Sequence, residues 1–146
     1  MKFADFTEGM VADTTTFSLH EQSIIDFARQ HDPQWFHLDV QAAEEGPYGG
    51  LIASGWQTAC LAMRKAVDHF LHDSESFGSP GLAYLKWLAP VRPGDALRLH
   101  VTVLEKRLSS KNPALGVMRW RWQVFNQKDV CVLDLEATSL FDLTRS

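Results

Sequence analysis

Asp32 and His37 are the side chains whose types and spacing best suit acid–base chemistry. They stand five residues apart in the segment HDPQWFHLD. Their ordinary pKa values lie near about 3.9 for aspartate and about 6.5 for histidine, so at neutral pH one is a base and the other can accept or donate a proton. Placed on either side of one water molecule, such a pair can activate it as a nucleophile and return a proton elsewhere.

Spacing alone leaves a structural interpretation of this pair open. An aspartate before a proline often caps a turn, and a loop histidine is commonly satisfied by neighbouring polar groups. Trp35 and Phe36 lie between the two residues, and their bulk can exclude water and shift both pKa values. Because perturbed pairs also occur for structural reasons, the spacing indicates a candidate site and not yet an activity.

Ser54 and Gly55 form a second candidate element, at the start of a predicted helix. Free backbone N–H groups at a helix start lie at the positive end of the helix dipole, which suits a developing oxyanion. The alternative is that Ser54 only caps the helix and that Gly55 only permits close packing.

A helix is predicted from about Leu19 to Gln30, just before the acid–base pair. Ser18 and Glu21 have the spacing of a capping box at its start. Pro33 disfavours the helical conformation in the residue before it, so the helix must end near Asp32. We therefore expect Asp32 where a helix meets an irregular loop.

That loop is expected from His37 to Gly50, and a central helix then runs from Ser54 or Gly55 to about His72. Gly46 to Met63 contains no charged residue, but its glycines, proline and polar residues fit a buried loop and helix better than a membrane span. Apolar residues nearly encircle the first half of the helix, so we expect other elements to wrap it. Those at helical spacing are Ala59, Cys60, Met63, Ala66, Val67, Phe70 and Leu71.

Strand patterns account for the remaining sequence. A short strand is predicted at Val11 to Phe17, and Leu82 to Ala89 is a mostly apolar strand that precedes a Pro-Gly turn in VRPGD. Three longer segments alternate apolar and polar residues, as antiparallel strands with one covered face do. Their apolar positions are Leu97, Leu99, Val101 and Val103; Met118, Trp120, Trp122 and Val124; and Cys131, Leu133, Leu135, Ala137 and Phe141. The prediction is an α+β fold of one domain, residues 1–146, in which a curved antiparallel sheet wraps the central helix.

The composition narrows the classes of function. The formal net charge of −4 gives no basic excess for a nucleic-acid partner. Cys60 and Cys131 are too few for a disulfide framework and lack metal-ligand spacing. His69 and His72 are three residues apart on a helix, but no further ligand lies nearby, so no metal is expected. The first ten residues contain no apolar signal-peptide region. We expect a soluble cytoplasmic protein that does not enter a membrane.

The run FARQHDPQWFHLDVQAAEEGPYGGLIASGW resembles the hydratase segment of the MaoC-like, (R)-specific enoyl-CoA hydratase family. The resemblance extends over essentially the whole chain. It implies the family's hot-dog fold, in which an antiparallel sheet wraps a long central helix. The family's catalytic aspartate and histidine match Asp32 and His37. Its oxyanion-hole glycine matches Gly55, with Ser54 and Trp56 beside it in the substrate-binding segment.

Two positions depart from the family pattern. Gln34 stands in for an asparagine, with the proline moved to Pro33, and Met63 occupies the place where some members have a serine near the aspartate. The resemblance implies a lyase that reversibly hydrates a trans-2-enoyl thioester at its third carbon. Coenzyme A or an acyl carrier would enter as part of the substrate, and no separate cofactor is expected.

Two other functions stay open. A hot-dog thioesterase would hydrolyse the same class of substrate, with Asp39, Glu44 or Glu45 as the carboxylate near the carbonyl carbon. A non-catalytic acyl-thioester-binding relative would retain only the fold, and the departures at Pro33 and Met63 keep this alternative open.

A homodimer or larger homo-oligomer is also expected. A single hot-dog sheet leaves a long edge and one face open, and such surfaces are commonly covered by a partner. The strands carry Trp87, Trp120 and Trp122, which we expect to pack at a sheet face or a subunit interface.

Overall fold

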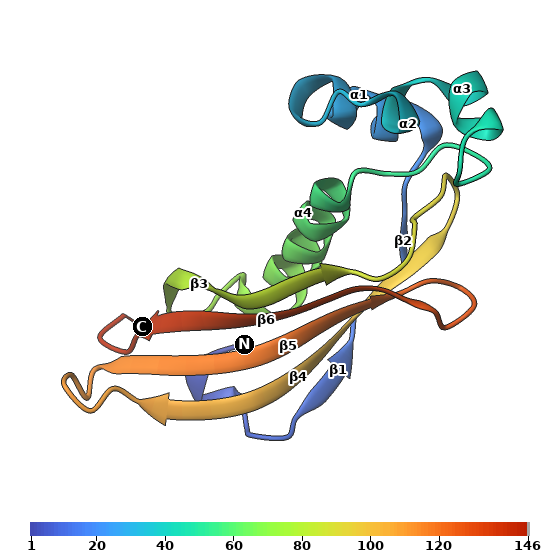
Figure 1. Ribbon diagram of the computed structural model, residues 1–146. Helices are drawn as coiled ribbons and strands as arrows, with labels where there is room; N and C mark the ends of the chain where they lie inside the picture. Colours follow the sequence, from blue (N-terminus) through green and yellow to red (C-terminus); the bar gives the residue numbers. More distant parts are fainter. Residues whose placement is uncertain (146) are drawn as a thin grey trace.

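A computed structural model describes residues 1–145 of the chain, in which one antiparallel sheet curves along a single long helix (Figure 1). The strand order is β1-β4-β5-β6-β3, and a short strand β2 also pairs with β4. The long strands are β3 (Ser76–Trp87), β4 (Ala96–Leu108), β5 (Leu115–Phe125) and β6 (Cys131–Asp142). The short ones are β1 (Val11–Asp13) and β2 (Phe17–Ser18). This arrangement confirms the predicted α+β hot-dog fold.

The alternating patterns of β4, β5 and β6 are the reason for the sheet's two different faces. Successive strand residues point to opposite sides, and in these strands every second side chain is buried over most of the length. The inner face forms the core with Leu97, Leu99, Val101, Val103, Trp120, Trp122, Val124, Leu133, Leu135 and Ala137. Tryptophans 120 and 122 therefore pack at a sheet face, as expected.

The central helix α4 (Gly55–Ala66) lies on one face of the sheet and continues as a π-helix, η2 (Val67–Leu71) (Figure 1). This matches the predicted span closely. Thr58, Ala62, Ala66 and Phe70 are buried on one side of the helix. The expectation that other elements wrap the first half of the helix is wrong for one flank, where Trp56, Cys60 and Met63 are exposed. That flank faces β3, the strand at the edge of the sheet.

The predicted capping box before the first helix is wrong. Helix α1 (Glu21–His31) begins after His20, and Ser18 belongs to β2, where it pairs with Ala96 of β4. The backbone of Ser18 is thus fixed by a sheet contact distant in sequence, which keeps it out of the helix start. The predicted end is confirmed, because Asp32 is the residue that follows the last helical turn.

The irregular loop expected from His37 to Gly50 instead contains two short helices. They are α2 (Trp35–Leu38) and α3 (Val40–Glu45). The side chain of Asp39 accepts a hydrogen bond from the N–H of Ala42 at 3.0 Å, which caps α3. With α1, these helices lie beyond the N-terminal end of α4 (Figure 1). A 3₁₀-helix, η1 (Phe3–Asp5), lies near the start of the chain.

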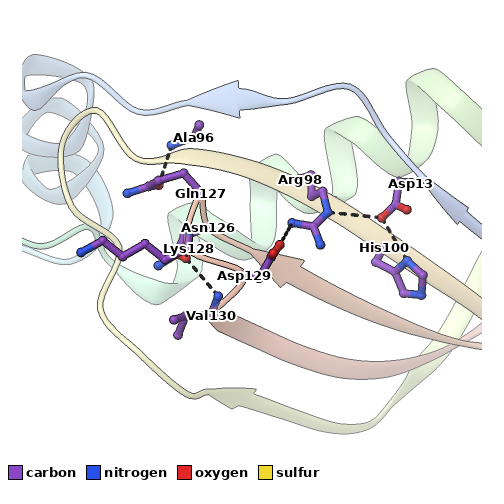
Figure 2. A network of polar contacts seen from close by, with 9 residues as sticks. All are labelled: Asp13, Ala96, Arg98, His100, Asn126, Gln127, Lys128, Asp129 and Val130. Carbon is purple, nitrogen blue, oxygen red and sulfur yellow. Dashed lines mark hydrogen bonds and ion pairs between the residues drawn. The ribbon is translucent and has the colours of Figure 1, made fainter.

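Charged side chains join β1 to β4 and to the turn that links β5 and β6 (Figure 2). Arg98 of β4 lies between two carboxylates. Its Nε atom is 3.6 Å from Oδ1 of Asp13 in β1, and its Nη1 atom is 2.9 Å from Oδ1 of Asp129 in the turn. The Nδ1 atom of His100 lies 3.0 Å from the same Asp13 carboxylate. These side-chain contacts add to the backbone pairing of β1, which joins β4 through three residue pairs.

Candidate active site

His37 lies in α2, with its side chain turned into the molecule. The residue is 4% exposed, and its Nδ1 atom lies 2.7 Å from the carbonyl oxygen of Ile52. A carbonyl oxygen only accepts hydrogen bonds, so Nδ1 carries the hydrogen in this contact. The other ring nitrogen, Nε2, is therefore the atom that can exchange a proton, and it lies 3.2 Å from Oδ2 of Asp32.

Asp32 meets His37 because α1 ends beside α2. Its Oδ1 accepts a hydrogen bond from Nε2 of Gln34 at 2.6 Å, and its Oδ2 accepts one from Oγ of Ser54 at 2.8 Å. Partial burial raises the pKa of the Asp32 carboxyl, but the hydrogen bonds from Gln34 and Ser54 and the nearby His37 together lower it more. The net pKa lies below the ordinary aspartate value, which favours the carboxylate.

His37 and Asp32 can share one exchangeable proton between Nε2 and Oδ2. With Nδ1 protonated, Nε2 of a neutral imidazole is an acceptor, and so is each oxygen of a carboxylate. At 3.2 Å the two atoms attract each other only when a proton lies between them. The structure thus brings together the two side chains that the sequence predicted, in a geometry suited to proton transfer.

Ser54 and Gly55 stand where α4 begins, but they differ in what they contact. Ser54 is fully buried, and its hydroxyl donates a hydrogen bond to Asp32. It does not cap the helix, which was the alternative left open by the sequence. The carbonyl of Ser54 accepts the N–H groups of Gln57 and Thr58. Among residues 1–145, the N–H of Gly55 has no acceptor, which leaves it available to a ligand at the positive end of the helix.

The Trp87 ring occupies the space that a side chain at position 55 would need. A Cβ atom at Gly55 would lie 2.4 Å from the indole ring of Trp87, which is too close for any side chain unless the ring moves. The indole therefore packs directly on the backbone at the start of α4. Trp87, which the sequence placed at a sheet face or an interface, belongs to strand β3 of the sheet, and it also lines the cavity described next.

A cavity of about 320 Å³ lies beside these groups. His37, Gly55, Thr58 and Trp87 line it, with apolar residues that include Val91. Sequence reasoning missed Thr58 and Trp87. Thr58 could have been found from its position one helical turn after Gly55, because residues three apart share a helix face. Nothing local connects Trp87 with Gly55, since the two meet only through the packing of β3 against α4.

Trp56 lies apart from this cavity, although the sequence grouped it with Ser54 and Gly55. Its ring is exposed and meets the edge of Trp87 at a centroid distance of 4.9 Å. It lines a second, apolar groove of about 640 Å³ between α4 and β3, together with Met63. Met63 thus faces this groove, whereas the hydroxyl that supports Asp32 comes from Ser54.

The carboxylates considered for a thioesterase are not at the cavity. Asp39 caps α3, while Glu44 and Glu45 are exposed, and none of the three lines the cavity. Within residues 1–145, no three His, Cys, Asp or Glu side chains gather as metal ligands would. No helix in this part of the chain is long and apolar enough to cross a bilayer.

Comparisons with known proteins agree with this fold. A family model described as MaoC like domain matches residues 4–118. The protein YdeM of Bacillus subtilis (strain 168) is 31% identical over 140 residues, 96% of this chain and 98% of that protein. The MaoC-like dehydratase from Rhodospirillum rubrum has a TM-score of 0.88 and 33% identity, covering 95% of this chain and 94% of its own. The R-hydratase PhaJ1 from Pseudomonas aeruginosa has a TM-score of 0.77 and 28% identity, covering 95% and 84%.

Proposed function

Because this chain belongs to the MaoC-like domain family, which includes hydratases and dehydratases, we propose that it adds water reversibly to a trans-2-enoyl thioester. The observation that carries the proposal is the approach of His37 Nε2 to Asp32 Oδ2, 3.2 Å apart. Gly55 supports it, because its N–H group lines the same cavity and has no acceptor within the described residues 1–145. The fold and the family support the class of reaction, and the site supports its chemistry.

In the proposed reaction, Asp32 and His37 hold one water molecule against the third carbon of the acyl chain. The water oxygen bonds to that carbon while one of its protons passes to the pair. The pair then delivers a proton to the second carbon, so that all atoms of the water are added across the double bond. General acid–base help of this kind is typically worth about 10²–10⁴ in rate.

Negative charge develops on the thioester oxygen as the water attacks. The N–H group of Gly55 would stabilise this enolate-like oxygen, because it lies at the positive end of α4 and has no other acceptor among residues 1–145. The addition of water to a double bond is not a redox reaction. We therefore propose that the protein needs no separate cofactor, and that coenzyme A or an acyl carrier arrives as part of the substrate.

Two substitutions test the assignment. Asp32→Asn and His37→Ala should each lower the rate of crotonyl-CoA hydration by about 10²-fold or more. The rate is measured from the loss of enoyl absorbance. Asp39→Asn and His31→Ala are matched controls outside the cavity, and asparagine also caps helices well. Near-normal hydration by either site variant, in folded protein, would sink the proposal.

The same incubation separates the alternative functions. A thioesterase would release free thiol from acetyl-CoA without loss of enoyl absorbance from crotonyl-CoA. Asp39 caps α3, and Glu44 and Glu45 are exposed, whereas Asp32 lies 3.2 Å from His37, which lines the cavity. This difference favours the hydratase. A non-catalytic relative would bind acyl thioesters of several chain lengths without turnover.

We also propose a homodimer or a larger homo-oligomer. Strand β3 is at the edge of the sheet, so one side of its backbone has no partner strand in the part of the chain that the structure describes. Its exposed apolar side chains include Phe77 and Leu82. A second copy of the chain would satisfy the free backbone groups of this edge and cover those side chains.

A further inference from the structure

Thr58 places a hydroxyl group in the same cavity as Gly55 and His37. The residue is 2% exposed and lies on α4, one turn after Gly55. Buried hydroxyl groups normally have a hydrogen-bond partner, because leaving one without a partner costs stability. Among residues 1–145, this hydroxyl makes no hydrogen bond, and its oxygen is open to the cavity and not enclosed by protein, so a ligand in the cavity is the natural candidate.

The helix itself does not engage this hydroxyl. A helical threonine often donates to the carbonyl four residues earlier, which for Thr58 belongs to Ser54. That carbonyl oxygen already accepts the N–H groups of Gln57 at 3.0 Å and Thr58 at 3.3 Å. A carbonyl oxygen has two lone pairs, so its capacity is used by the backbone and the hydroxyl is left for the cavity.

The position of Thr58 on the helix directs its side chain toward Gly55. Side chains of an α-helix lean toward its N-terminus and cover the turn before their own Cα atom. For Thr58 this is the turn that begins at Gly55, whose N–H group has no acceptor among residues 1–145. The two donors therefore converge on one region of the cavity, whereas Asp32 receives its hydroxyl contact from Ser54.

We propose that Thr58 is a catalytic residue whose hydroxyl donates a second hydrogen bond to the thioester carbonyl oxygen, beside the N–H group of Gly55. This inference rests on the proposed function, because it assumes that an acyl thioester occupies the cavity. Two donors hold the oxygen in one orientation and share the charge that develops on it during water addition.

Infrared spectroscopy of a bound thioester tests this contact without turnover. Butyryl-CoA labelled with ¹³C at the carbonyl has no carbon–carbon double bond in its acyl chain, so it cannot be hydrated. Hydrogen bonds to its carbonyl oxygen shift the carbonyl stretch to lower frequency. Thr58→Val keeps the shape of the side chain and removes the donor, so the shift should become smaller, while Thr58→Ser should retain it. An unchanged shift in Thr58→Val overturns the proposal.

Hydration kinetics give the second measurement. Thr58→Val should lower kcat for crotonyl-CoA by roughly 10²-fold, the typical effect of removing one oxyanion donor, and should leave the pH dependence unchanged. Thr58→Ser should stay within about a few-fold of wild type. If Thr58→Val does not fold, as judged by circular dichroism, Thr58→Ala replaces it. Normal kcat in a folded variant without the hydroxyl overturns the role of Thr58.

The two experiments also distinguish this proposal from the hydratase assignment. If the wild-type protein binds butyryl-CoA but never hydrates crotonyl-CoA, the proposed function fails while the infrared comparison still decides whether Thr58 contacts the carbonyl. Asp32→Asn should abolish hydration and keep the infrared shift, because Asp32 does not contact the carbonyl oxygen in the proposed site.

Discussion

At the scale of single residues, the protonation state of Asp32 depends on two hydrogen-bond donors, one close to it in the sequence and one distant. Gln34 is two residues away and donates to Oδ1, whereas Ser54 is 22 residues away and donates to Oδ2. Burial raises the pKa of Asp32, but these two hydrogen bonds and His37 bring it below the ordinary value. Ser54 thus connects the proposed acid–base pair with the start of α4, where Gly55 stands.

Ser54→Ala should move the acid limb of the pH–rate profile to higher pH. The hydroxyl stabilises the charged form of Asp32, so its removal raises the pKa of that carboxyl. Protonation, and with it the loss of activity as the pH falls, then begins at a higher pH than in wild type. The measurement is kcat/KM for crotonyl-CoA as a function of pH. Ser54→Thr keeps the hydroxyl and serves as control, and an unmoved acid limb in Ser54→Ala would contradict this role.

At the scale of elements, a buried carboxylate links three strands on the face of the sheet opposite α4. Arg121 of β5 donates to both oxygens of Asp134 in β6, at 3.0 and 2.7 Å, and the Tyr84 hydroxyl of β3 donates at 2.9 Å. The hydrogen bonds from Arg121 lower the pKa of Asp134, burial raises it, and Tyr84 lowers it further, so the net pKa is depressed. The cluster holds the edge strand β3 in register with the sheet.

Asp134→Asn should lower the free energy of unfolding at pH 7 by about 1–3 kcal/mol, because two strong donors lose a charged acceptor. The depressed pKa means that this stabilisation is present above the unfolded-state pKa near about 3.9 and is lost as the pH falls through the folded-state value. Urea unfolding should therefore show a difference from wild type that shrinks in acid. Asp129→Asn is the control, since its exposed ion pair with Arg98 contributes little. An equal loss in both variants would contradict the prediction.

At the scale of the whole molecule, the two edges of the sheet differ. The edge at β1 is short, with three residues, while β3 spans twelve residues and has exposed apolar side chains. Long exposed edges favour pairing with another chain. We therefore expect self-association to proceed through β3.

Light scattering during size-exclusion chromatography should give the mass of a dimer or a larger assembly. Leu82→Lys, a charge on the β3 edge strand, should shift the protein toward monomer, because edge lysines oppose strand pairing. Val11→Lys places the same charge on an exposed residue of β1 and should leave the mass unchanged. A wild-type protein of strictly monomeric mass, at all concentrations tested, would rule out this assembly.

The sequence by itself determined the features that depend on neighbouring residues. Pro33 ends α1 and places Asp32 at the helix end, and the alternation in β4, β5 and β6 defines the covered face of the sheet. The spacing of Asp32 and His37 indicated a candidate pair, and the resemblance to a family strengthened it. The two side chains meet because α1 and α2 are adjacent along the chain. Local patterns reveal which side of an element is buried, and they succeed where position depends on local geometry.

Only the tertiary structure decided which partners these residues meet. The Ser54 hydroxyl reaches Asp32 and does not cap α4, the Trp87 ring closes over Gly55, and Ser18 pairs with β4 outside the helix start. Periodicity shows that a residue is buried but not what lies against it. The partners come from the packing of β3 and the helices around α4, and this packing joins segments that no local pattern relates.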